Sequence, residues 1–103
     1  MSNYINVPFN SDQIYVVKEG AFLDIIKLTM SDFREIKVVG KPNLVFEENH
    51  TNLMIYLEVK VKETSRKSLN TLFKNISNQL KSAIKSLIDI KPKNIQLILR
   101  GFY

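Results

Sequence analysis

The sequence has no cysteine, no tryptophan and only three glycines among its 103 residues. Without cysteine the chain cannot form disulfides, zinc–thiolate sites, iron–sulfur clusters or a cysteine nucleophile. Three glycines are too few for a glycine-rich phosphate cradle, and Gly40-Lys41 runs directly into Pro42 instead of the hydroxyl residue of a P-loop. These absences exclude several large classes of cofactor and nucleotide enzymes.

Long apolar runs are missing as well. The longest extends from Leu53 to Leu57, far short of the roughly 20 residues that span a bilayer. The N-terminal residues lack the basic and apolar regions of a signal peptide, so we expect a cytoplasmic protein with no transmembrane segment. With 45% apolar and 24% charged residues the composition is that of a globular protein, and the length suits a single α+β domain over residues 1–103.

Charge is distributed unevenly along the chain. Residues 1–58 hold five Lys or Arg and eight Asp or Glu, whereas residues 59–103 hold ten and two. The formal charge is therefore −3 in the first part and +8 in the second, and the sequence pI is near 9.5. One strongly basic part suits an anionic partner such as nucleic acid, anionic lipid or an acidic protein.

Alternation of apolar and polar residues predicts the strands. The clearest is Leu53–Val61, in which every second side chain is apolar, and a short polar turn joins it to the preceding strand as an antiparallel hairpin. The first strand contains Pro8, which cannot donate to a ladder and restricts this strand to a sheet edge. The predicted strands run through Ile5–Phe9, Ile36–Val39, Leu44–Phe46, Leu53–Val61 and Ile95–Arg100.

Helical spacing of apolar residues predicts two helices. The first follows a cap at Ser11 or Asp12 and ends near Ser31. The second follows a cap at Thr64 or Ser65 and stops before a proline. The apolar stripes comprise Ile14, Val17, Ala21, Ile25 and Leu28 in the first helix, and Leu69, Leu72, Phe73, Ile76, Leu80, Ala83, Ile84, Leu87 and Ile88 in the second.

The order of elements is a short edge strand followed by helix, strand, strand, helix and strand, which predicts an α+β fold. The apolar face of the hairpin needs a cover, and two amphipathic helices supply one. We therefore expect a two-layer sandwich in which both helices pack on one face of a small mixed sheet.

Few residues suggest catalytic chemistry. His50, the only histidine, lies in a polar turn, where a metal would need further ligands, and a solvated turn histidine is the simpler interpretation. Ser82 and Lys85 match a Ser-x-x-Lys pattern, which often arises in helices rich in these residues and has no companion motif here. We predict a protein without catalytic, cofactor-binding or metal-binding residues, and not an enzyme.

The second helix carries a candidate anion or partner face. Spacings of four and seven residues place Lys67, Lys74, Lys81 and Lys85 on one side, opposite the apolar stripe. Lysines in this arrangement neutralise phosphates, although a solvated helix surface has the same pattern. No aromatic residues are interleaved for base stacking.

The sheet face away from the helices carries a candidate association face. Met54, Tyr56 and Ile98 are apolar residues expected on that face. Exposed together they would form a surface for self-association or for a protein partner. The alternative is a mixed solvent face with scattered apolar residues.

Several segments resemble the alkaline shock protein family. Ile5–Leu28 is similar to its short first strand and opening helix. Leu57–Lys62, the long helix Ser65–Ile88 and Ile95–Phe102 resemble its second half, in which an alternating strand leads to a long helix and a terminal strand ending in Gly plus an apolar residue. The resemblance implies a small, intracellular, non-enzymatic protein without cofactors. Such proteins self-assemble or bind a protein partner, and some attach peripherally to membranes through that partner.

The order helix, hairpin, helix, strand also resembles the KH-like domain of ribosome-assembly factors, although the Gly-x-x-Gly loop of KH domains is absent. The sequence therefore supports two hypotheses. The first is a non-enzymatic assembly or adaptor protein that acts through protein–protein contacts. The alternative is an RNA-binding or ribosome-associated module that uses the basic helix face.

Overall fold

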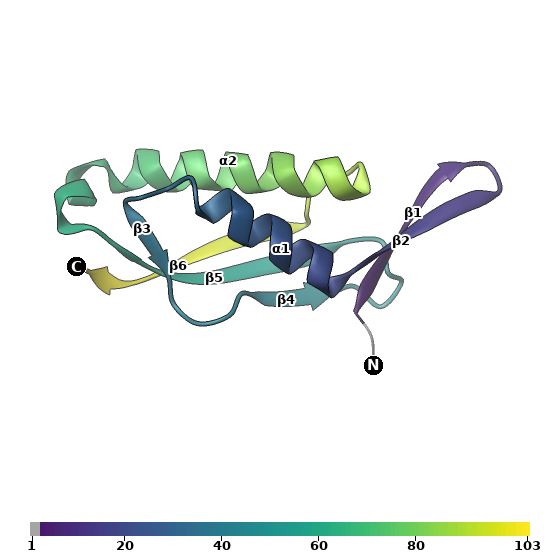
Figure 1. Cartoon of the computed structure of the whole chain (residues 1–103), viewed down its shortest axis with the longest axis horizontal. Helices are drawn as coiled ribbons and strands as arrows, with labels where there is room; N and C mark the ends of the chain where they lie inside the picture. The colour runs from purple at the N-terminus through teal and green to yellow at the C-terminus, as the bar shows by residue number, and fades with distance from the viewer. Residues whose placement is uncertain (1–2) are drawn as a thin grey trace.

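A computed structural model describes residues 3–103. Two α-helices and six strands are joined by short turns and one 3₁₀ helix (Figure 1). In chain order the elements are β1 (Tyr4–Asn10), β2 (Gln13–Lys18), α1 (Glu19–Met30), β3 (Ile36–Val38), β4 (Asn43–Phe46), β5 (Leu53–Val61), η1 (Glu63–Ser68), α2 (Leu69–Ile88) and β6 (Asn94–Phe102).

Strand β5 is the centre of the main sheet. On one side it pairs in parallel with β6, with Leu57 opposite Leu97. On the other side β4 pairs antiparallel with the first half of β5, and β3 pairs antiparallel with the second half. β3 and β4 therefore form one interrupted row, broken around Gly40, whose φ of 71° favours glycine. The mixed sheet has the order β3/β4, β5, β6.

Both helices cover one face of this sheet (Figure 1). The alternation in β5 makes a continuous apolar row on that face, and each of its five members is 0% exposed. Helix α2 meets the row through residues four apart, and α1 adds Phe22 and Ile26. Burying a Leu or Ile side chain stabilises by about 1.5–3 kcal/mol, so this layer holds the fold together. The buried positions are Leu53, Ile55, Leu57, Val59 and Val61 in β5, with Leu72, Ile76, Leu80, Ile84 and Ile88 in α2.

The predicted α+β sandwich is confirmed in class, but the predicted first helix begins too early. Residues 13–18 form β2, which pairs antiparallel with β1 and places Val17 opposite Ile5. Val16, Val17 and Ile14 are β-branched, and such residues fit a pleated strand better than a helix. The first strand consequently forms a separate two-stranded sheet with β2 instead of an edge of the main sheet.

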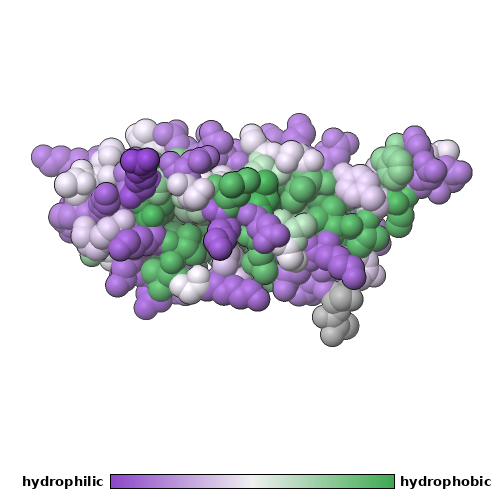
Figure 2. Space-filling view, viewed as in Figure 1, coloured by the Kyte–Doolittle hydropathy of each residue, from purple (hydrophilic) through white to green (hydrophobic). Residues whose placement is uncertain are grey.

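The β1–β2 hairpin projects from the body as an arm, and the described chain extends over 51 × 25 × 19 Å (Figure 1). Its base is buried through Ile5, Val7 and Val17. Toward the tip, Phe9 and Ile14 are exposed, and apolar atoms are visible on the arm in Figure 2. Among residues 3–103, neither helix combines the length and the apolar composition needed to cross a bilayer.

The N-terminus of α2 also differs from the prediction. Thr64 and Ser65 lie within η1, and no side-chain hydrogen bond caps either η1 or α2. At the other end the helix stops at Asp89, which has a left-handed φ of 66° and donates its N–H to the Lys85 carbonyl at 2.8 Å. This is the usual geometry for a helix end.

Candidate functional site

Strand β6 has an open edge. Within the described chain this nine-residue strand pairs only with β5, so half of its backbone N–H and C=O groups have no strand partner. Two apolar residues near its middle reach solvent, Ile98 at 41% and Leu99 at 36% exposure. From Asn94 to Leu99 the strand has no proline and no charged residue, the features that usually protect an edge.

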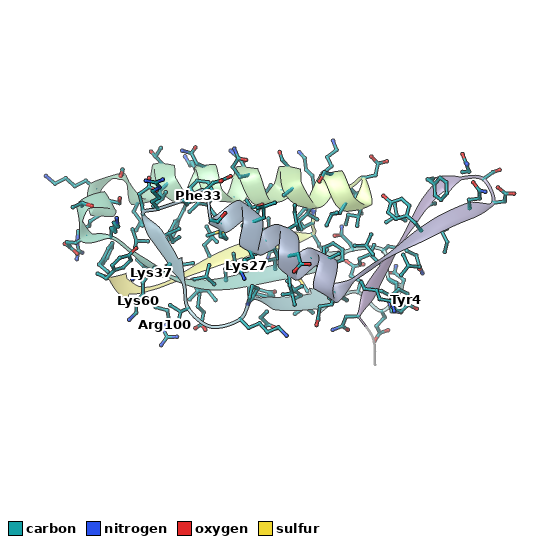
Figure 3. All side chains as sticks on the ribbon, viewed as in Figure 1. Tyr4, Lys27, Phe33, Lys37, Lys60 and Arg100 are labelled. Carbon is teal, nitrogen blue, oxygen red and sulfur yellow. The ribbon has the colours of Figure 1, made fainter. Side chains whose placement is uncertain are left out.

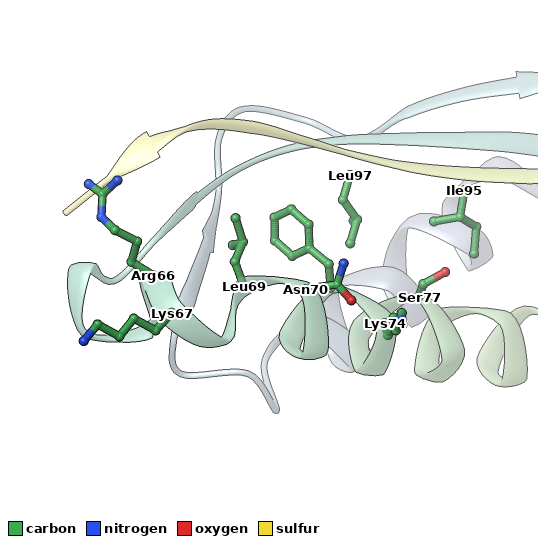
Figure 4. A pocket seen from close by; sticks show the side chains of 9 residues that line it. Arg66, Lys67, Leu69, Asn70, Lys74, Ser77, Ile95 and Leu97 are labelled. Atoms are coloured by element: carbon green, nitrogen blue, oxygen red, sulfur yellow. The ribbon is translucent and has the colours of Figure 1, made fainter.

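A groove of about 630 Å³ runs beside this edge, between β6 and the first half of α2 (Figure 4). Leu69 and Phe73 from α2, with Ile95 and Leu97 from β6, form its apolar floor. All four are half-buried and pack on the outside of the core. Phe73 was predicted in the apolar stripe, and the structure places it at the groove side of that stripe.

The rim of the groove is basic. Arg66, Lys67 and Lys74 border it together with the polar residues Asn70 and Ser77. Within residues 3–103 the ion pairs are Glu63–Arg66, Glu47–Lys93 and Glu58–Arg100, so no described acidic side chain pairs with Lys67 or Lys74. The rim therefore presents uncompensated positive charge above an apolar floor.

Arg66 is fixed at one end of this rim. Its Nε and Nη2 donate to the two carboxylate oxygens of Glu63 at 2.7 and 2.9 Å. These hydrogen bonds hold the pKa of Glu63 below its ordinary value and the pKa of Arg66 above its ordinary value. The guanidinium also lies 4.0 Å from the ring centroid of Phe102. Both contacts orient Arg66 at the end of β6.

The four lysines of the predicted anion or partner face are all exposed. Lys67 lies in η1 rather than in α2 and, with Lys74, borders the groove. Lys81 and Lys85 lie further along α2, where they and Lys91 line a separate, smaller hollow of about 300 Å³. The structure thus divides the predicted face into two lysine pairs.

The predicted association face lies on the sheet surface opposite the helices. Met54 and Tyr56 are half-buried, and the Tyr56 hydroxyl donates to the Met54 sulfur at 3.5 Å. Across the β5–β6 pair, Met54, Tyr56 and Ile98 stand opposite polar or acidic residues, namely Asn94, Gln96 and Glu58.

A cationic group adjoins this face. Lys37, Lys60 and Arg100 come from three neighbouring strands and lie at the end of the sheet away from the arm (Figure 3). Arg100 donates to Glu58 at 3.1 Å, and the Lys37 ammonium lies 4.5 Å from the ring centroid of Tyr103. Polar and charged side chains therefore surround the apolar ones.

His50 has a structural position. It is half-buried in the β4–β5 turn and stacks on Tyr4, so the expectation of a solvated turn histidine is wrong. Across residues 3–103 no group of three or more His, Asp or Glu side chains is arranged to hold a metal ion. Ser82 and Lys85 both lie on the solvent side of α2.

The groove could not be recognised in the sequence because it needs α2 and β6 to be placed beside one another. The available signal was the apolar content of both faces of β6, where Leu97, Ile98 and Leu99 are consecutive. Comparison of the sequence with protein-family models and with curated proteins gives no match.

Proposed function

We propose that this chain is a non-enzymatic assembly or adaptor protein of the alkaline shock type. It works in the cytoplasm through protein–protein contacts, and the open edge of β6 is its main contact surface. The open edge is the observation that carries this proposal.

Edge strands form backbone hydrogen bonds with other chains unless they are covered, shortened or charged. β6 has nine residues, and apolar side chains in its central part are exposed. Its charged residue, Arg100, lies at the register shift near the end of the strand, which leaves the preceding residues free to pair. A partner strand would extend the main sheet by one strand on this side.

Site-specific photo-crosslinking in cells tests this contact. A photoreactive residue at Leu99 should give a discrete cross-linked protein, because Leu99 lies on the open strand. The same residue at Leu28, which is apolar and 65% exposed on α1, is the matched control and should give none. Sedimentation of the purified protein then separates self-association from a different partner. Equal labelling from both positions, or no protein cross-link from Leu99, would refute the proposal.

The alternative is an RNA-binding or ribosome-associated module. It is supported by the exposure of Lys67, Lys74, Lys81 and Lys85 and by the +8 charge of residues 59–103. Phosphate binding by lysine releases counterions and weakens steeply as salt rises, whereas an apolar protein contact does not. Co-migration with ribosomal particles at low salt, lost at high salt, would favour this alternative. Salt-independent association would count against it.

A further inference from the structure

The register of β6 determines where the side chains of an added strand would point. Ile95, Leu97 and Leu99 stand opposite Ile55, Leu57 and Val59, which are buried beneath the helices. Side chains alternate between faces, and neighbouring strands lie about 4.8 Å apart. Every second side chain of a strand added to β6 would therefore point to the helix side, next to Ile95 and Leu97 and into the groove.

The floor of the groove selects apolar side chains. Leu69 and Phe73 face Ile95 and Leu97 across it, and all four retain partial solvent exposure. A side chain laid between them would remove apolar surface of both partners from water. The central helix-side positions of the added strand should therefore be apolar.

The rim selects negative charge. Lys67 and Lys74 have no acidic partner among the described residues, and Arg66 has Glu63 alone. An acidic side chain beside the apolar ones would lie near one or more of these cations. Opposite charges across an interface accelerate association and exclude wrong partners.

The same charges disfavour a second copy of this chain. Two copies of the chain could pair through their β6 edges in antiparallel orientation, related by a twofold axis perpendicular to the sheet. This arrangement would place both α2 helices on the same face of the joined sheet, side by side. The two helices would run antiparallel, so the exposed lysines of one α2 and its preceding turn would lie beside those of the other copy and repel them. These lysines are Lys67, Lys74, Lys81 and Lys85. The strand β2 of the arm carries Lys18 and no acidic residue, so it lacks the required charge as well.

On the basis of the proposed role of β6, we infer that the groove receives an extended acidic segment of a different protein. The segment pairs with β6 as an added strand. Its central helix-side residues are apolar and contact Leu69, Phe73, Ile95 and Leu97, and acidic residues flanking them meet Arg66, Lys67 and Lys74.

The test uses the full chain, isotope-labelled for NMR, and a blocked peptide as long as β6, nine residues. Threonine occupies the odd positions of the peptide, and the even positions are Glu, Ile, Ile and Glu. A second peptide has Lys in place of both Glu. The acidic peptide should perturb the amides of β6 and bind on the order of tenfold more tightly than the basic one at low salt.

Two protein variants localise the charge effect. Lys67→Glu with Lys74→Glu should abolish the preference for the acidic peptide. Lys81→Glu with Lys85→Glu makes the same change in net charge further along α2, away from the groove, and should retain most of that preference. Equal effects of the two variants would show that overall charge acts rather than the groove, and would overturn the inference.

Two further peptides test strand pairing. One carries N-methyl groups at the odd backbone nitrogens and the other at the even ones. Only alternate N–H groups of an added strand point to its neighbour, so one peptide should bind and the other should not. If both bind or both fail, the added-strand geometry is wrong.

The remaining outcomes separate this inference from the proposed function. Equal binding of acidic and basic peptides at β6 overturns the acidic partner and leaves the protein contact at β6 intact. A dimer cross-linked through Leu99 overturns it in favour of a second copy. Binding of a single-stranded RNA oligonucleotide to the groove, in place of the peptide, overturns it in favour of nucleic acid. Absence of any protein cross-link at Leu99 removes the proposed function itself.

Discussion

The imidazole of His50 stacks on the ring of Tyr4, with ring centroids 3.9 Å apart and the planes 5° from parallel. The His50 Nδ1 also lies 3.1 Å from the Tyr4 carbonyl oxygen, and the His50 carbonyl accepts from the Asn6 N–H at 2.8 Å. Tyr4 begins the arm, whereas His50 lies in the β4–β5 turn of the main sheet. This pair therefore fastens the arm to the body.

Replacing His50 should loosen that attachment. His50 has a φ of 58°, which Asn tolerates well, so His50→Asn removes the stacked ring without adding backbone strain. We expect a loss of about 1 kcal/mol, the scale of an aromatic pair, and faster hydrogen exchange at the Asn6 amide. His50→Phe keeps a ring at this position, so the Asn6 amide should exchange more slowly in His50→Phe than in His50→Asn. Identical exchange in both variants would mean that the stack does not hold the arm.

The two phenylalanines on the helices should differ in their contribution to stability. Phe22 is 0% exposed and packs edge-on against Phe46 at 5.7 Å, whereas Phe73 lines the open groove. Phe22→Ala should lower the free energy of unfolding by about 3–5 kcal/mol. Phe73→Ala should cost only about 1–2 kcal/mol, because the groove already admits water. Urea unfolding measures both, and equal costs would place Phe73 in the core.

The helix end at Asp89 is a site where a substitution should stabilise the protein. Its left-handed φ of 66° is unfavourable for a side-chain-bearing residue, and a carboxylate at a helix C-terminus opposes the helix dipole. Asp89→Gly should raise the free energy of unfolding by about 0.5–1 kcal/mol. Asp89→Ala removes the same charge but keeps the strain. If Asp89→Gly melted at no higher temperature than Asp89→Ala, the left-handed backbone at this position would not be a source of strain.

The Glu63–Arg66 pair predicts a small pH effect. Hydrogen bonds from Arg66 lower the pKa of Glu63 in the folded state. The pair therefore contributes stability above the ordinary carboxyl pKa of the unfolded chain, and loses it as pH falls through the lowered folded value. Both side chains are exposed, so the contribution is small. An NMR titration should show a higher Glu63 midpoint in Arg66→Gln than in the unsubstituted chain. An unchanged midpoint would show that the pair does not persist in solution.

Much of the main sheet could be predicted from the sequence because its signals were strong. The alternation from Leu53 to Val61 has one physical solution, a strand with one face buried. The repeated apolar residues of Leu69–Ile88 require a helix that covers this face. Where the apolar residues have a clear period and the face that they cover is known, few alternative secondary structures fit the sequence.

The arm was missed because two local signals coincide. Polar residues at 10–13 suit a hairpin turn as well as a helix cap, since short side chains that bond to the backbone serve both. Ile14 and Val17 also fit helical spacing by chance. Residues 13–18 form a strand because they pair with β1. Such pairing depends on a second segment, so the local sequence pattern alone does not reveal it. The groove escaped prediction for the same reason.

The central position of β5 also orders the events of folding. From Met54 to Val59, each residue of β5 pairs with the β6 residue forty positions later in the chain. The whole of α2 lies between the two strands, so β6 can pair with β5 only after the chain has passed through α2. The β4–β5 hairpin closes a much shorter loop, and β3 pairs with β5 at a smaller sequence separation than β6 does, so these antiparallel pairings are entropically cheaper to form first. β6 should therefore add last, as the slow closing step. Truncating its half-buried side chain in Leu97→Ala should accelerate unfolding while leaving the refolding rate nearly unchanged. Until β6 has paired, the facing edges of β5 and β6 are both free to pair with strands of other chains.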